Sequence, residues 1–251
     1  MGGSDSAGTP WEGRHFEHND FSADDGSAPE RLIEALRRFR AREVGAVDVV
    51  DAFRESRLLI PLVARLGESD IGDHGHVVDK SAELSIVTVA GPDGRNVMPV
   101  FSSVEAMQRW NPKARPVPAD AVRVALAAAS DDTELVVLDA TSATEFVIRR
   151  PALWAIARSQ PWTPSYLDEE VLREFVTAAH PESAVSAVVL DTGDADARLA
   201  GPELIVRLAL VPGLAQLELD ALLARLQQRW SASPVITARV DAMRVQLTAV
   251  S

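Results

Sequence analysis

Apolar residues recur at helical spacing near the start of the chain. Leu32, Ile33, Leu36 and Phe39 alternate with charged residues. Because an α-helix turns once in about 3.6 residues, this spacing gathers the apolar side chains on one face. We therefore predict an amphipathic helix here, and a shorter helix over 47–53.

A β-hairpin followed by a helix is the clearest local prediction. Two apolar segments, 84–90 and 96–101, flank the sequence Gly91-Pro92-Asp93-Gly94. Proline fixes φ and glycine admits positive φ, so this sequence is typical of a tight turn. Ser102-Ser103-Val104-Glu105 then fits a capping box for a helix that ends near Trp110, just before a proline.

The pattern continues through both halves of the chain. The first half predicts strands over 58–63, 135–138 and 145–148, an extended segment over 115–118, and helices over 119–130 and 151–157. The second half predicts a helix through Phe175, strands over 185–191, 204–211, 235–240 and 244–249, and a helix with an apolar stripe from Leu219 to Trp230.

A short proline-rich segment favours neither helix nor strand, so we place a domain boundary at Pro161-Trp162-Thr163-Pro164. The order strand–strand–helix–strand–strand occurs on both sides of it, over 84–148 and 185–249. We therefore predict an α+β protein of two ββαββ-like modules, each a mostly antiparallel sheet covered by helices, with extra N-terminal helices. The predicted domains span 29–160 and 165–251.

Residues 1–28 predict an acidic, flexible tail. Acidic residues greatly outnumber the single Arg14, and glycine and serine are frequent. Such a segment buries too little apolar surface to offset the entropy lost on ordering. Trp11, Phe16 and Phe21 are exceptions, and they leave open whether the tail docks on the protein itself or on a partner.

Charge and composition narrow the classes of partner. The 251 residues include 37 acidic residues against 25 Lys and Arg, which gives a formal net charge of −12. This charge repels phosphate backbones and anionic membranes, so we expect no nucleic acid and no membrane partner. Cysteine is absent, which excludes disulfides and thiolate chemistry and is compatible with a reducing cytosol. We expect a cytoplasmic protein.

A run of short motifs between Lys80 and Trp162 resembles a known family. The motifs are Lys80-Ser81-Ala82-Glu83, Pro92-Asp93-Gly94-Arg95, Pro99-Val100-Phe101-Ser102, Trp110-Asn111-Pro112, Ala114-Arg115-Pro116-Val117-Pro118 and Leu138-Asp139. In this order they resemble the SseB family, named for enhanced serine sensitivity, in its actinobacterial form. The second module is similar to the family's second domain only in length and element order. The resemblance implies a cytoplasmic protein and supplies no catalytic residues.

Candidate catalytic and metal-binding residues are few. His74 and His76 lie among aspartates in a polar loop, where imidazole and carboxylate could bind zinc or nickel, or where the loop is simply solvated. Ser102 and Ser103 could suggest a nucleophile, but helix capping explains both. No glycine-rich phosphate loop is present. We therefore expect no cofactor and no catalytic site.

The aromatic residues near prolines suggest an interaction surface. Phe101, Trp110, Arg115, Pro116 and Trp162 are the candidate contact residues. Tryptophan beside proline is common on protein-binding surfaces, and also where loops pack on a small core. The leading hypothesis is a non-enzymatic interaction or regulatory protein with a protein partner. The alternatives are a small-metabolite (amino-acid) binding protein or an enzyme linked to serine sensitivity, and a scaffold that self-associates through strand edges.

Overall fold

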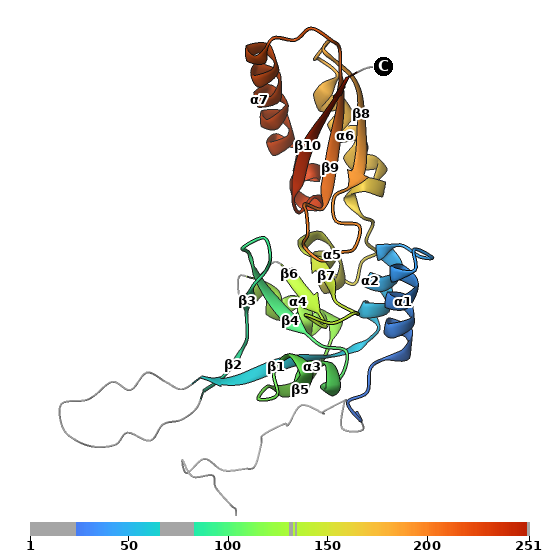
Figure 1. Ribbon diagram of the computed structural model, residues 1–251, viewed down its shortest axis with the longest axis vertical. Helices are drawn as coiled ribbons and strands as arrows, with labels where there is room; N and C mark the ends of the chain where they lie inside the picture. The colour runs from blue at the N-terminus through green and yellow to red at the C-terminus, as the bar shows by residue number, and fades with distance from the viewer. Residues whose placement is uncertain (1–23, 66–82, 131–132, 134, 250–251) are drawn as a thin grey trace, which may run out of the picture.

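The computed structural model describes residues 24–65, 83–130, 133 and 135–249 (Figure 1). They form two units stacked end to end: an N-terminal unit over 24–157 and a C-terminal unit over 165–249. Residues 158–164, between the units, form neither helix nor strand. The chain is α+β, as the sequence predicts. Most of the predicted tail and the loop of His74 and His76 lie outside the described residues.

The N-terminal unit is built on a four-stranded mixed sheet. Its strands, in the order β3-β4-β6-β7, are Val89–Ala90, Asn96–Val100, Leu135–Leu138 and Phe146–Arg149. β4 and β6 are parallel, and the other two pairings are antiparallel. Every residue of β6 and β7 is buried, because structure covers both faces of the sheet there.

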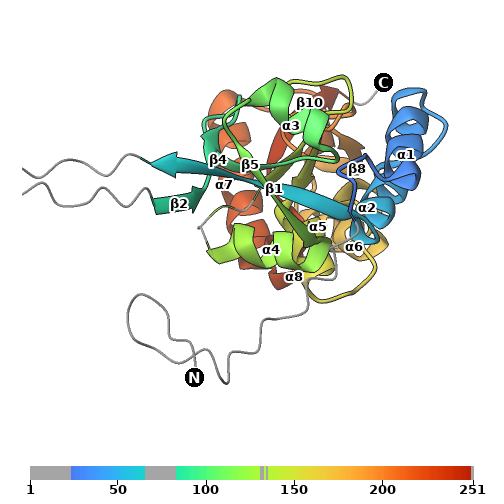
Figure 2. The same cartoon turned by 90° about the horizontal axis from the view of Figure 1, so that it is seen from below.

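A second sheet of the N-terminal unit is antiparallel and has the order β2-β1-β5. β2 is Glu83–Ile86, β1 is Arg57–Arg65 and β5 is Arg115–Asp120. A bridge between Leu59 and Phe101 joins β1 to the end of β4. Figure 2 shows β1 crossing this unit, with α3 (Val104–Trp110) and α4 (Ala121–Ser130) on opposite sides of it.

Helices complete the main core of the N-terminal unit. α1 (Glu30–Arg40), α2 (Ala46–Arg54) and α5 (Arg150–Ala157) add their apolar faces to those of α4 and the strands. The shared core residues include Leu32, Leu36, Phe53, Met98, Val124, Ile148 and Ile156. The predicted amphipathic helix over Leu32 to Phe39 is thereby confirmed, with Leu32, Leu36 and Phe39 buried.

The predicted hairpin is confirmed at its turn. Gly94 has a φ of 84°, which suits glycine, and the amide of Gly91 donates to the carbonyl of Arg95. The strand predicted over 84–90 is in fact divided. β2 pairs with β1, whereas β3 pairs with β4, so the two pieces belong to different sheets.

The C-terminal unit has a three-stranded sheet in the order β10-β9-β8. Its elements are a 3-10 helix η1 (Ser165–Leu167), α6 (Glu169–Ala179), β8 (Val185–Thr192), β9 (Leu204–Leu210), α7 (Gln216–Ala232), α8 (Pro234–Arg239) and β10 (Met243–Ala249). Alternate residues of β9 are buried against the helices, as expected for a sheet with one covered face. Trp230 packs edge-on against Phe175 in this core, so the predicted stripe of α7 is confirmed.

The strand predicted over 235–240 is wrong, because this segment forms α8. The β-branched residues favour a strand, but the start of the segment favours a helix. The hydroxyl of Ser233 accepts a hydrogen bond from the amide of Ile236, and Pro234 occupies the first turn, where its missing N–H costs nothing. Capping and the burial of Ile236 therefore outweigh β propensity.

The two units share a topology that differs from the predicted ββαββ order. In each, an antiparallel pair is followed by a crossover to a third strand parallel to the second: β3-β4 then β6, and β8-β9 then β10. β7 is additional in the N-terminal unit. Each sheet of this type is therefore mixed. Among the described residues, no helix is both long and apolar enough to cross a membrane.

Candidate functional site

The residues predicted to form one interaction surface lie in three different settings. Phe101 is fully buried, and its ring centroid lies 5.2 Å from that of Trp110. Trp110, the last residue of α3, is half-buried in the same small cluster. Phe101 therefore supports Trp110 from inside the protein and has no surface of its own to offer a partner.

Arg115 and Pro116 are exposed on β5, which is an edge strand. Pro116 pairs in register with Pro61 of β1, so prolines face each other across these strands. Trp162 lies elsewhere, in the segment between the units. It is partly buried against the main core, and its Nε1 has no hydrogen-bond partner within the part of the chain that the structure describes.

Ser102 and Ser103 also differ in role. Ser103 begins α3, and its hydroxyl accepts from the amide of Ala106. Ser102 is buried, and its hydroxyl donates to Asp139 at 2.7 Å, so capping does not explain it. Ser102 cannot meet a substrate at that depth. Across the described residues, no group of three or more His, Cys, Asp or Glu is placed to hold a metal ion.

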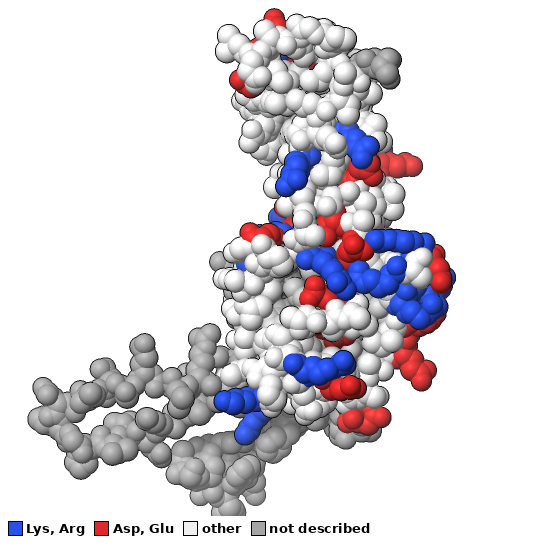
Figure 3. Space-filling model, in the orientation of Figure 1, with Lys and Arg blue, Asp and Glu red and all other residues white. Residues whose placement is uncertain are grey.

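A buried ionic network joins the two units. Arg149, at the end of β7, lies 2.6 Å from Asp194 and 3.0 Å from Asp241 of the C-terminal unit. Arg95 also contacts Asp241, at 3.0 Å. The side chains of Arg149, Asp194 and Asp241 are 8%, 3% and 1% exposed, so each charge depends on its partners for compensation. Figure 3 shows basic and acidic side chains gathered where the units meet.

The loop over 193–203, between β8 and β9, makes most of this contact. The carboxylate of Asp194 accepts from the amides of Arg198, Leu199 and Ala200 and so shapes the loop. Leu199 is buried among apolar residues of the N-terminal sheet, and the amide of Val147 donates to the carbonyl of Ala197. The loop is thus fixed to β7 by packing, by a backbone hydrogen bond and by charge.

Two arginines at the end of α1 fasten the same loop from the other side. Arg42 donates to the carbonyl of Ala195 at 2.6 Å and pairs with Asp196. Arg40 donates to the carbonyls of Glu145 and Asp196. Both guanidinium groups are therefore already engaged by oxygen atoms at the junction.

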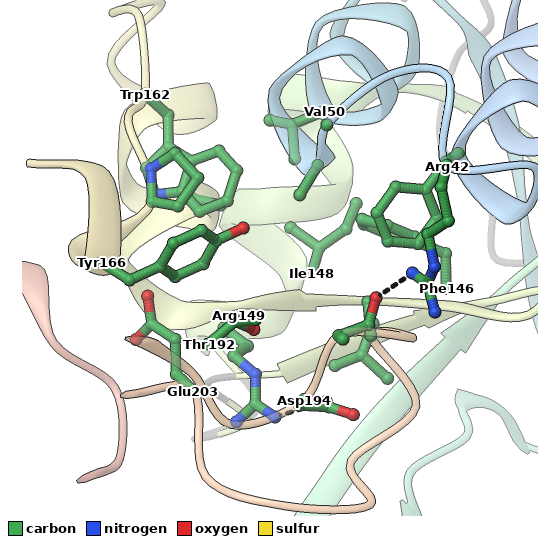
Figure 4. A pocket seen from close by; sticks show the side chains of 18 residues that line it. Arg42, Val50, Phe146, Ile148, Arg149, Trp162, Tyr166, Thr192, Asp194 and Glu203 are labelled. Carbon is green, nitrogen blue, oxygen red and sulfur yellow. Dashed lines mark hydrogen bonds and ion pairs between the residues drawn. The ribbon is translucent and has the colours of Figure 1, made fainter. Parts of the chain in front are cut away.

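A cavity of about 340 Å³ lies between the units (Figure 4). The N-terminal unit contributes walls that are mainly apolar, and the C-terminal unit and the connecting segment supply aromatic and polar groups. The principal lining residues are Phe39, Ala46, Val50, Phe146, Ile148, Trp162, Tyr166, Thr192 and Glu203. We call this cavity the cleft.

Glu203 is the most unusual group of the cleft. It is 6% exposed, and it accepts hydrogen bonds from the Ser165 hydroxyl at 2.9 Å and from the amide of Asp241 at 2.7 Å. Both donors are neutral, and no ion pair of Glu203 occurs within the described residues. Burial raises the pKa of Glu203, and the charge of Asp241 adds to that rise, whereas these two hydrogen bonds and the charge of Arg149 oppose it.

Tyr166 lies beside Glu203 on the same wall. Figure 4 shows its ring between Trp162 and Glu203, with its hydroxyl directed toward the centre of the cleft. Burial raises the pKa of Tyr166, and the charge of Glu203 raises it further. The hydroxyls of Tyr166 and Thr192 have no hydrogen-bond partner among the residues described, so both are available to a ligand.

Sequence reasoning found only Trp162 of this site. In the sequence, Arg149 stands out only as part of the basic pair Arg149-Arg150, and Glu203 only as the last residue of a polar loop. The sequence does contain one sign of this site. The turn-rich segment 193–203 is unusually long for a connection between paired strands. Its length is explained by its contacts with the other unit.

A protein-family model for the SseB protein N-terminal domain matches residues 32–155. The chain belongs to the SseB family. The resemblance drawn from the motifs is therefore confirmed for the N-terminal SseB domain, while a second SseB domain and the actinobacterial form stay predictions. No curated protein and no solved structure matches the chain. Phe39, Phe146 and Ile148 of the cleft belong to the matched SseB domain, whereas Tyr166 and Glu203 lie beyond it.

Proposed function

We propose that this SseB-family protein binds a small, largely apolar molecule in the cleft between its units, without catalysing a reaction on it. The observation that carries the proposal is a cavity of about 340 Å³ that both units line. Small-molecule sites have volumes of roughly 300–1,000 Å³ and combine apolar walls with a few directed polar groups. The cleft has both properties.

The construction of the cleft supports a binding role. Arg149, Asp194 and Asp241 hold the units together beneath it, so its walls are fixed before a ligand enters. A preformed site avoids part of the entropy cost of binding. The Ser165 hydroxyl lies 2.9 Å from the Glu203 carboxylate, but Ser165 is fully buried and does not line the cleft, which favours binding over catalysis.

The walls favour an apolar ligand over serine, the amino acid of the family name. Phe146 and Ile148 lie on one side, with Phe39 packed against Phe146, and Trp162 with Tyr166 forms the other. Burying apolar surface contributes about 25 cal/mol per Å², and serine carries little of it. An aromatic or branched aliphatic group would use these walls.

The test is a thermal-shift screen of a metabolite library on the full chain. Ala46 lines the cleft at the first turn of α2 and is only half-buried, so Ala46→Trp fills the cavity with little disturbance of the core. Ala224→Trp places the same side chain on an exposed face of α7 and is the matched control. We expect ligands that stabilise wild type and Ala224→Trp but not Ala46→Trp. A screen in which no compound stabilises the wild type would contradict the proposal.

A protein-binding surface on β5 is the second candidate. Arg115, Pro116 and Val117 are exposed there on an edge strand, next to the half-buried Trp110. Exposed edge strands offer free backbone groups for pairing, and on β5 the two prolines supply carbonyl acceptors but no N–H donors. If this surface holds a partner, Arg115→Glu removes that protein from an affinity purification while Arg173→Glu, on exposed α6, keeps it. Identical partners with both variants would remove this candidate.

A further inference from the structure

We infer that the cleft selects a protonated primary amine carried on an aromatic or aliphatic body. The inference rests on the proposed function and names the chemical class of its ligand. The apolar body lies between the two walls, and the ammonium group lies near Tyr166 of η1, Thr192 at the end of β8 and Glu203 just before β9.

The buried carboxyl group of Glu203 makes no ion pair within the described residues. Glu203 is buried with neutral donors only, from Ser165 and from the backbone of Asp241. A buried charge is costly unless an opposite charge accompanies it. A cationic ligand would supply that charge, and an anionic ligand would add a second negative charge beside the first.

The arginines that line the cleft are already paired with carboxylates. Arg42 and Arg149 also line the cleft, and both could in principle attract an anion. However, Arg42 already pairs with Asp196, and Arg149 with Asp194 and Asp241. A carboxylate ligand would have to compete with these ion pairs. The charge of Arg149 also acts on Glu203, but Glu203 makes no ion pair within the described part of the chain, so an ammonium group there would displace none.

The polar side of the cleft offers oxygen atoms that can accept hydrogen bonds from an ammonium group. A primary ammonium has three N–H donors. The hydroxyl oxygens of Tyr166 and Thr192 can each accept a hydrogen bond, and a carboxylate oxygen of Glu203 can accept another beside the one it has. The three donors of the amine thus have three candidate acceptors among the residues that line the cleft.

Aromatic rings line both sides of the cleft. Phe39 and Phe146 meet edge to face, with centroids 5.2 Å apart, and Trp162 and Tyr166 lie across the cleft. The negative faces of such rings attract cations as well as apolar groups. They therefore suit the body of the ligand and do not oppose its charge.

The test uses three probes with one body: 2-phenylethylamine, 2-phenylethanol and 3-phenylpropanoate, titrated calorimetrically into the full chain. We expect the amine to bind roughly tenfold more tightly than the alcohol, the gain of one charge-assisted contact, and the carboxylate to bind most weakly. Glu203→Gln should reduce the amine to the affinity of the alcohol. Glu169→Gln, an exposed carboxamide substitution on α6, should leave the order unchanged.

The outcomes separate the two proposals. If the alcohol or the carboxylate binds as tightly as the amine, and Ala46→Trp abolishes that binding, the amine inference is wrong and the cleft remains a binding site. If library compounds bind but none of the three probes does, the amine inference is again wrong. If nothing in the library binds either, the proposed function fails with it. Should Glu203→Gln not fold, Thr192→Val is used, and equal amine affinity in that variant and wild type counts against the inference.

Discussion

The guanidinium of Arg149 lies 2.6 Å from the carboxylate of Asp194 and connects the last strand of the N-terminal sheet to the β8–β9 loop. Asp241 accepts from the same guanidinium, at 3.0 Å. Both ion pairs are almost completely buried. Replacing Arg149 would therefore deprive the carboxylates of Asp194 and Asp241 of this partner in a region that excludes water.

Arg149→Met is expected to destabilise the protein strongly. Deleting one partner of a buried ion pair costs about 3–5 kcal/mol, because the remaining charges are uncompensated. Denaturant unfolding followed by tryptophan fluorescence measures the change in the free energy of unfolding. Arg173→Met, on an exposed face of α6, is the control and should change it little. A loss in Arg149→Met no larger than in the control would show that the network does not hold the units together.

Gly201→Ala tests the shape of the loop. A Cβ at Gly201 would overlap the carbonyl oxygen of Gly193, where the two ends of the loop meet. Relieving such overlap by moving backbone costs about 1–3 kcal/mol. Gly45→Ala, where a Cβ meets only a distant Asp48 oxygen, is the matched control. We expect Gly201→Ala to lower the melting temperature and Gly45→Ala to leave it nearly unchanged, and equal melting temperatures would contradict the described loop.

Glu203 links stability to pH in an unusual direction. Because burial raises its pKa, the folded protein holds this proton more tightly than the unfolded chain does. Its contribution to stability is therefore present at low pH and is lost as pH rises through the folded pKa. The charged groups that act on Glu203 are Asp241, which raises its pKa further, and Arg149, which lowers it, and the phenol of Tyr166 lies beside it. In Glu203→Gln the side chain is uncharged. Its amide oxygen can still accept from the amide of Asp241 and its NH2 group can donate to the Ser165 hydroxyl, so the variant should gain stability relative to wild type as pH rises from about 4 to about 8. A stability difference that does not change with pH would contradict this.

Glu182 behaves in the opposite way. Hydrogen bonds from Arg225 and then Arg229, against the opposing effect of burial, lower its pKa to about 2. Its stabilising contribution is therefore present above the ordinary glutamate pKa and is lost as pH falls toward 2. Glu182→Gln should cost about 1–2 kcal/mol at pH 7 and much less near pH 2. Urea unfolding at both pH values measures it, and an equal cost at both would be the contrary result.

Local sequence signals predict the elements of the fold well where they agree with one another. The stripe of α1 and the turn at Gly94 are correct because periodicity and turn chemistry act within a few residues. The segment over 235–240 is wrong because two local signals conflict there. Its β-branched residues favour a strand, and the Ser233 cap with Pro234 decides for a helix.

The cleft could not be predicted in the same way. Phe39, Phe146 and Tyr166 lie far apart in the sequence, and none belongs to a motif that indicates a binding site. Phe101 carries part of the family motif, yet it is buried, so its place in the motif reflects packing. Only the docking of the β8–β9 loop on β7 brings the lining residues together, and that contact depends on the tertiary fold.

The most direct test of ligand binding in the cleft is one calorimetric comparison. 2-Phenylethylamine is titrated into the wild-type chain, Ala46→Trp and Ala224→Trp under identical conditions. We predict one site of equal affinity in the wild type and Ala224→Trp, and no measurable heat of binding in Ala46→Trp. Equal binding to all three chains would place the ligand elsewhere and contradict the account.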